Sequence, residues 1–120
     1  MITLKIGDKQ YKLLMNVYTM ELMEAEFGSM EKMFEQAETG RVSTVMKMFR
    51  CLANSALYRE GKEENITGKE LRNLNVPAIN GISKAIRAAV DEGMKAEMVD
   101  GNEADDEVYD VYLAEIEAKN

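Results

Sequence analysis

The first thirteen residues alternate between hydrophobic and polar side chains. Residues 2–6 read Ile-Thr-Leu-Lys-Ile, and a period of two is typical of a β-strand with one buried face. Gly7-Asp8 interrupts the pattern, and glycine in the first position of a two-residue loop favours a type II′ hairpin turn. The chain then returns through residues 10–13, so we expect a hairpin whose apolar face packs on another element, because a lone hairpin is marginal in water. The predicted cross-strand pairs are Leu4 with Tyr11 and Ile2 with Leu13.

From residue 16 onward, hydrophobic positions recur every three or four residues, which predicts amphipathic helices. Gly28 and Ser29 are suited to end one helix and cap the next, and Thr67 precedes Glu70 at the spacing of a capping box. The predicted helices are 16–27, one from 30 that Gly40 stops, one from 41 or 43 that Gly61 closes, 67–74, 78–98 with Pro77 at its start, and 103–118. We therefore expect an α+β fold, mostly α, with the N-terminal β-hairpin packed on a small bundle of about five helices.

Charge is distributed unevenly along the chain. The 120 residues include 15 Lys and Arg and 22 Asp and Glu, a net charge of −7. Residues 1–99 hold 14 acidic and 14 basic side chains, whereas residues 100–120 hold eight acidic side chains and one basic one. We therefore predict two regions: a hairpin plus helical domain over residues 1–99, and an acidic, helical C-terminal segment over residues 100–120.

The composition excludes several kinds of chemistry. There is no His, which rules out Ser-His and Cys-His catalytic pairs and His-ligated zinc, and a single Cys rules out an internal disulfide. The acidic stretch from Asp100 lacks the glycine and the glutamate that an EF-hand loop needs at its sixth and twelfth positions. Cys51 stands in an apolar helix and is expected to be a buried structural thiol. We expect no catalytic, cofactor-binding or metal-binding residues.

The chain also lacks the signals of membrane or nucleic-acid partners. No run approaches about 18 apolar residues, so no segment is expected to span a membrane. The alternating N-terminus does not resemble a signal peptide, and we expect a soluble intracellular protein. The acidic end would repel phosphate, so nucleic-acid binding there is not expected.

Methionine is abundant, with ten residues in the chain. Because Met is flexible and polarisable, it is common on surfaces that accept varied apolar partners, such as grooves for a partner's helix. The alternative is that these residues fill gaps in a small core. The candidate partner-binding residues are Met20, Met23, Met33, Phe34, Met46 and Phe49.

The order of these parts resembles the small tail assembly chaperones of long-tailed phages and prophages of Gram-positive bacteria. The resemblance covers most of the chain and rests on short motifs. They are the hairpin over residues 2–11, a helix ending Phe27-Gly28-Ser29-Met30-Glu31, a helix ending Ala56-Leu57-Tyr58-Arg59-Glu60-Gly61, the cap from Thr67 to Glu70-Leu71, and the acidic end.

The resemblance implies a non-catalytic function in the cytoplasm of the bacterial host. Such chaperones bind the long, apolar tape measure protein before the tail is built and then give way to tail tube protein. In many phages a longer product arises by a programmed −1 frameshift near the end of the gene. The final Ala118-Lys119-Asn120 is compatible with a slippery codon sequence, although a chance dipeptide explains it as well.

Other functions remain open on the sequence alone. A phage head–tail connector, or another small virion or regulatory helical protein, would share the helical pattern. An acidic inhibitor that imitates DNA fits less well, because residues 1–99 are neutral. An outer edge of the hairpin could also pair with another copy and give a homo-oligomer.

Overall fold

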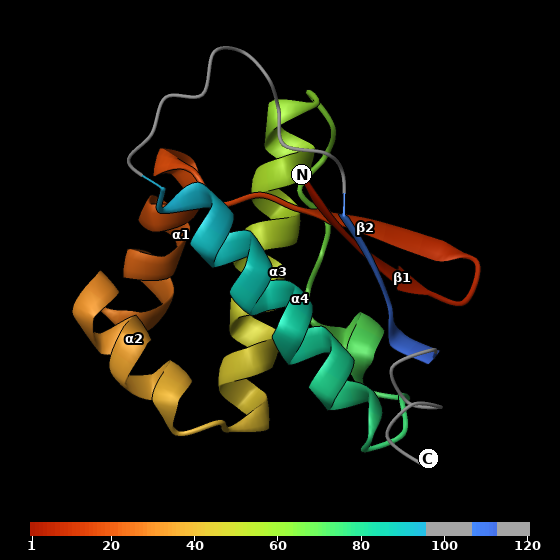
Figure 1. Cartoon of the computed structure of the whole chain (residues 1–120). Helices are drawn as coiled ribbons and strands as arrows, with labels where there is room; N and C mark the ends of the chain where they lie inside the picture. The colour runs from red at the N-terminus through yellow and green to blue at the C-terminus, as the bar shows by residue number, and fades with distance from the viewer. Residues whose placement is uncertain (96–106, 113–120) are drawn as a thin grey trace.

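The computed structural model describes residues 1–95 and 107–112, and its fold is α+β and mostly α (Figure 1). Three short strands form one sheet, and four α-helices and one 3-10 turn make up the rest of the described elements. In chain order these are β1 (Ile2–Ile6), β2 (Lys9–Leu13), α1 (Val17–Phe27), α2 (Met30–Glu38), α3 (Val42–Arg59), the 3-10 turn η1 (Lys69–Leu71), α4 (Ala78–Gly93) and β3 (Glu107–Asp110).

The predicted hairpin forms with the predicted register, but it belongs to a three-stranded sheet, and the described residues form four α-helices and one 3-10 turn in place of about five helices. β1 and β2 pair antiparallel, with Ile2 opposite Leu13 and Leu4 opposite Tyr11. Gly7 has a φ of 62°, whereas Asp8 does not have a positive φ. A positive φ at the first loop residue alone fits the type II′ turn expected for Gly-Asp.

The C-terminal segment differs from the prediction, because residues 107–110 form a strand and not part of a helix. β3 pairs parallel with β1 and places Tyr109 beside Leu4, and Lys5 Nζ lies 3.7 Å from an Asp110 carboxylate oxygen. Val and Tyr suit a pleated, half-buried surface, and pairing with β1 overrides the helical spacing of this acidic stretch. Residues 111 and 112 are helical, and the rest of the predicted helix lies outside the described residues.

The boundary between α1 and α2 follows the predicted caps Gly28 and Ser29, and Asn16 is a further cap that was not predicted from the sequence. The Asn16 side-chain oxygen accepts a hydrogen bond from the Thr19 backbone N–H at 3.0 Å, and Ser29 Oγ accepts one from the Lys32 N–H at 3.0 Å. Gly28 ends α1 with a φ of 97°, a conformation that favours glycine. These local hydrogen bonds satisfy helix N–H groups that have no partner within the helix.

Two helix predictions were wrong in part. In place of a helix over 67–74, only η1 forms. The Glu70 carboxylate accepts hydrogen bonds from the backbone N–H groups of Thr67 and Gly68, but Thr67 Oγ1 accepts from the Lys69 N–H and not from that of Glu70, so the predicted capping box is only half formed. α4 ends at Gly93 and not at residue 98. A Cβ on Gly93 would lie 2.2 Å from the Met15 carbonyl oxygen, so glycine allows the end of α4 to approach the backbone that precedes α1.

The core lies around α3, which contacts β2 and the other three α-helices. Figure 1 shows the sheet on one side of α3, α1 and α2 on the other, and α4 crossing it. A buried polar bridge joins α1 to α3, where Thr19 Oγ1 and Ser55 Oγ are 2.7 Å apart and Asn16 accepts from Ser55. In the described part of the chain, no helix is long and apolar enough to cross a membrane.

Candidate partner-binding groove

The six predicted partner-binding residues divide into core and surface. Met23, Met33 and Phe49 are each 0% exposed, so they are core residues and present no area to a partner in this structure. Met20 and Met46 are partly buried and pack against the core. Phe34 is 42% exposed, which makes it the one large exposed side chain of the set.

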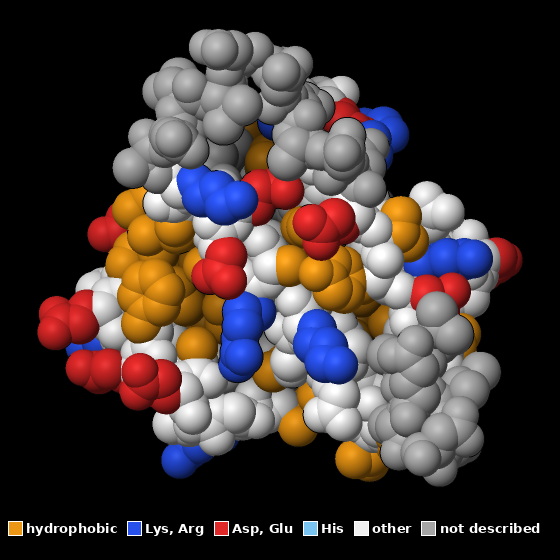
Figure 2. Space-filling view, in the orientation of Figure 1, with side chains coloured by type: hydrophobic (Ala, Val, Ile, Leu, Met, Phe, Trp, Pro, Cys, Tyr) orange, Lys and Arg blue, Asp and Glu red, His pale blue; other side chains and the backbone are white. Residues whose placement is uncertain are grey.

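Phe34 lies at a groove between α2, α3 and α4, with a volume of about 360 Å³. α3 contributes the floor because its N-terminal half lies between α2 and α4. Figure 2 views this face and shows hydrophobic side chains gathered over α1 and α2. The hydrophobic lining residues are Phe34, Ala37, Val45, Met48, Ile86 and Val90.

The groove carries charge at its edges. Glu38 comes from the end of α2, Arg41 precedes α3, and Arg87 and Asp91 lie one turn apart on α4. Within residues 1–95 and 107–112, none of these four side chains takes part in an ion pair. An apolar floor with unpaired charges at its edges can hold the apolar face of a helix and pair with that helix's flanking charges.

Sequence reasoning missed the α4 side of the groove. Ile86 and Val90 lie in the predicted helix over 78–98, and the apolar stripe of such a helix is expected to be buried as a whole. Their spacing of four places both on one face of α4. They are slightly more exposed than the rest of the buried stripe, and Arg87 lies next to them. The change from apolar to basic between Ile86 and Arg87 is the signal that could have identified them.

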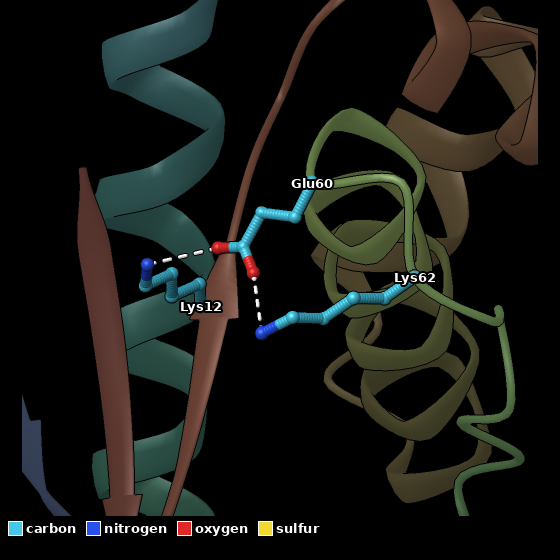
Figure 3. Close-up of polar contacts among 3 residues, drawn as sticks. All are labelled: Lys12, Glu60 and Lys62. Atoms are coloured by element: carbon cyan, nitrogen blue, oxygen red, sulfur yellow. Dashed lines mark hydrogen bonds and ion pairs between the residues drawn. The ribbon is translucent and has the colours of Figure 1, made fainter.

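A second, smaller hollow of about 150 Å³ lies between β2 and the C-terminal end of α3. Its charges satisfy one another, as Figure 3 shows: Glu60 accepts from Lys12 Nζ at 2.8 Å and lies 2.9 Å from Lys62 Nζ. The hydrogen bonds from Lys12 and Lys62 lower the pKa of Glu60 to about 2. Because this cluster is already neutralised in part and the hollow is small, the groove at α2, α3 and α4 is the better candidate for a partner.

Across the described ranges, no group of three or more Asp, Glu, Cys or His side chains could hold a metal ion. No family model, no curated protein and no solved structure matches the chain. The groove between α2, α3 and α4 is therefore the basis of the functional argument.

Cys51 is expected to react slowly with thiol reagents in the native protein. It is 3% exposed, and burial raises its pKa to about 11. Only the thiolate is nucleophilic, and a pKa two units above the ordinary value lowers the thiolate fraction about a hundredfold near pH 8. Labelling with a chromogenic disulfide reagent should therefore be at least about a hundredfold slower in buffer than in 8 M urea. Equal rates would show that α3 opens readily.

Proposed function

We propose that the protein is a non-catalytic tail assembly chaperone. It binds the tape measure protein of a long-tailed phage or prophage, keeps it soluble, and helps recruit tail tube protein. Within this proposal, the groove between α2, α3 and α4 receives one helical segment of the tape measure protein. The observation that supports the proposal is this apolar groove, with Phe34 exposed at its edge.

A long protein with repeated amphipathic helices aggregates when its apolar faces are unpaired. A small domain can cover one such face at a time, because a helix lays its apolar side into a hydrophobic groove. Several copies bound along one client would retain it strongly through individually weak contacts. Weak single contacts also allow the release that tail tube assembly requires.

Co-expression with a candidate tape measure protein tests the proposal. The proposal predicts that the gene for this chain lies beside a very long gene, and the product of that gene is the candidate. We expect the tape measure protein to move into the soluble fraction and to co-purify with several copies of this protein. If it stays insoluble and binds nothing, the proposal is wrong.

The Phe34→Asp variant tests the groove within the same assay. A carboxylate in place of the exposed ring would have to be desolvated by an apolar client face, so we expect at least about a tenfold loss of co-purified client. Val76→Asp is the matched control, because Val76 is 84% exposed and does not line the groove. Equal losses in both variants would mean that net charge, and not the groove, controls client binding.

A further inference from the structure

The α2 side of the groove is acidic. Glu31, Glu35 and Glu38 are exposed and follow at intervals of four and three, so they form one stripe along α2, of which Glu38 lines the groove and the other two lie outside it. Phe34 lies between this stripe and the groove floor. Among the described residues, none of the three carboxylates takes part in an ion pair.

The α4 side of the groove carries Arg87 and Asp91 in its lining and the basic Lys84 just outside it. Lys84 is exposed one turn before Arg87. Neither is ion-paired within residues 1–95 and 107–112, and Asp91 ends the basic stretch one turn later. Figure 2 shows the two sides together, with acidic side chains at the α2 edge of this face and both basic and acidic side chains over α4.

We infer that the groove binds an amphipathic helix whose apolar stripe has a basic flank and an acidic flank. The basic flank faces α2 and the acidic flank faces α4. This inference deepens the proposed function and rests on it for the identity of the client. The apolar floor supplies most of the contact. The charged flanks of the bound helix pair with the acidic stripe of α2 and with Lys84 and Arg87 on α4, which take part in no ion pair among the described residues.

The opposite charges of the two sides also determine direction. A helix turned end for end in the groove, with its apolar stripe still on the floor, exchanges the positions of its flanks. Only one direction then places basic residues at Glu38 and acidic residues at Arg87. Successive copies on one long client would therefore all face the same way along it.

Three synthetic helical peptides test the charge pattern with the full-length protein. Each is about 20 residues long and carries the same leucine stripe and a fluorescent label. One has lysines on one flank and glutamates on the other, one has lysines on both flanks, and one has glutamates on both. We expect the mixed peptide to bind about two- to fivefold more tightly than either of the others, because exposed ion pairs contribute modestly.

Charge reversal in the protein should change the ranking of the peptides. Arg87→Glu makes both sides acidic, so the peptide with lysines on both flanks should become the tightest. Glu35→Lys with Glu38→Lys makes both sides basic, so the peptide with glutamates on both flanks should become the tightest. Lys9→Glu is the control: it makes the same kind of charge change as Arg87→Glu, but at the hairpin turn, and should leave the ranking unchanged.

Several results would overturn the inference. The wild-type protein could bind all three peptides alike, or Arg87→Glu could leave the ranking as it was. The protein alone could also sediment as a dimer that Arg87→Glu dissociates, which would make a second copy the occupant. The proposed function is judged separately: if the peptides rank as expected and the tape measure protein is not retained, the inference holds and the chaperone proposal fails.

Discussion

Phe49→Ala is expected to lower the free energy of unfolding by about 3–5 kcal/mol. Phe49 is 0% exposed on α3, and its ring meets the Tyr11 ring edge to face with 5.3 Å between centroids. The substitution removes apolar surface from the core and leaves a cavity where α3 packs under the sheet. The structure around it can collapse only in part, because the sheet and the helices hold the walls apart.

Urea unfolding followed by far-UV circular dichroism measures this loss. Phe34→Ala is the matched control, because it deletes the same side chain at a position that is 42% exposed, and it should cost about 1 kcal/mol or less. Similar losses for the two variants would mean that Phe34 is buried in solution, and the groove would then have no exposed aromatic side chain. A large difference would separate the core residue from the surface residue among the six predicted partner-binding residues.

The hairpin and the first three helices could be predicted because their signals are local. The alternation of residues 2–6, the glycine at position 7 and the caps at Gly28 and Ser29 each determine backbone geometry within a few residues. For α1 and α2, residues close in the chain supply the hydrogen-bond partners at the helix starts. The tertiary packing of the hairpin and of α1, α2 and α3 is compatible with the structure that these local signals favour.

β3 could not be predicted in this way, because its partner strand is about a hundred residues away in the sequence. Val108, Tyr109 and Val111 fit either a strand or one face of a helix, and short apolar patterns do not separate the two. The acidic residues around them suggested a detached segment. Pairing with β1 and the 0% exposure of Val111 are contacts that only the folded chain contains.

The site was predicted only in part for a related reason. Methionine composition suggests an adaptable apolar surface, but the same side chains fill cores. Met23 and Met33 are buried and Phe34 is exposed because their side chains lie on different faces of α1 and α2. Which face is buried depends on how these helices pack. The groove itself is formed by three helices, so no single stretch of sequence contains its pattern.

Val111→Asp is expected to lower the free energy of unfolding by at least about 3 kcal/mol. Val111 is 0% exposed and belongs to the hydrophobic core directly after β3. A carboxylate there must either stay buried without a counter-charge or move into water and take β3 away from β1. The second route loses the strand pairing and the Lys5–Asp110 ion pair, so the measured loss reports how firmly the acidic segment is held.

Val108→Asp is the matched control for this prediction. It introduces the same charge three residues earlier, where the side chain is 59% exposed, and should change stability by about 0.5 kcal/mol or less. Urea unfolding of both variants also yields the m-value, which falls if β3 is already detached in the folded state, because less surface then remains to be exposed. Equal stability of the two variants would show that residues 107–112 leave the sheet at little cost, and the C-terminal segment would then act as a separate acidic tail. A large loss confined to Val111→Asp would make β3 a permanent third strand, which covers one edge of β1 and restricts strand pairing with another copy to the outer edges of β2 and β3.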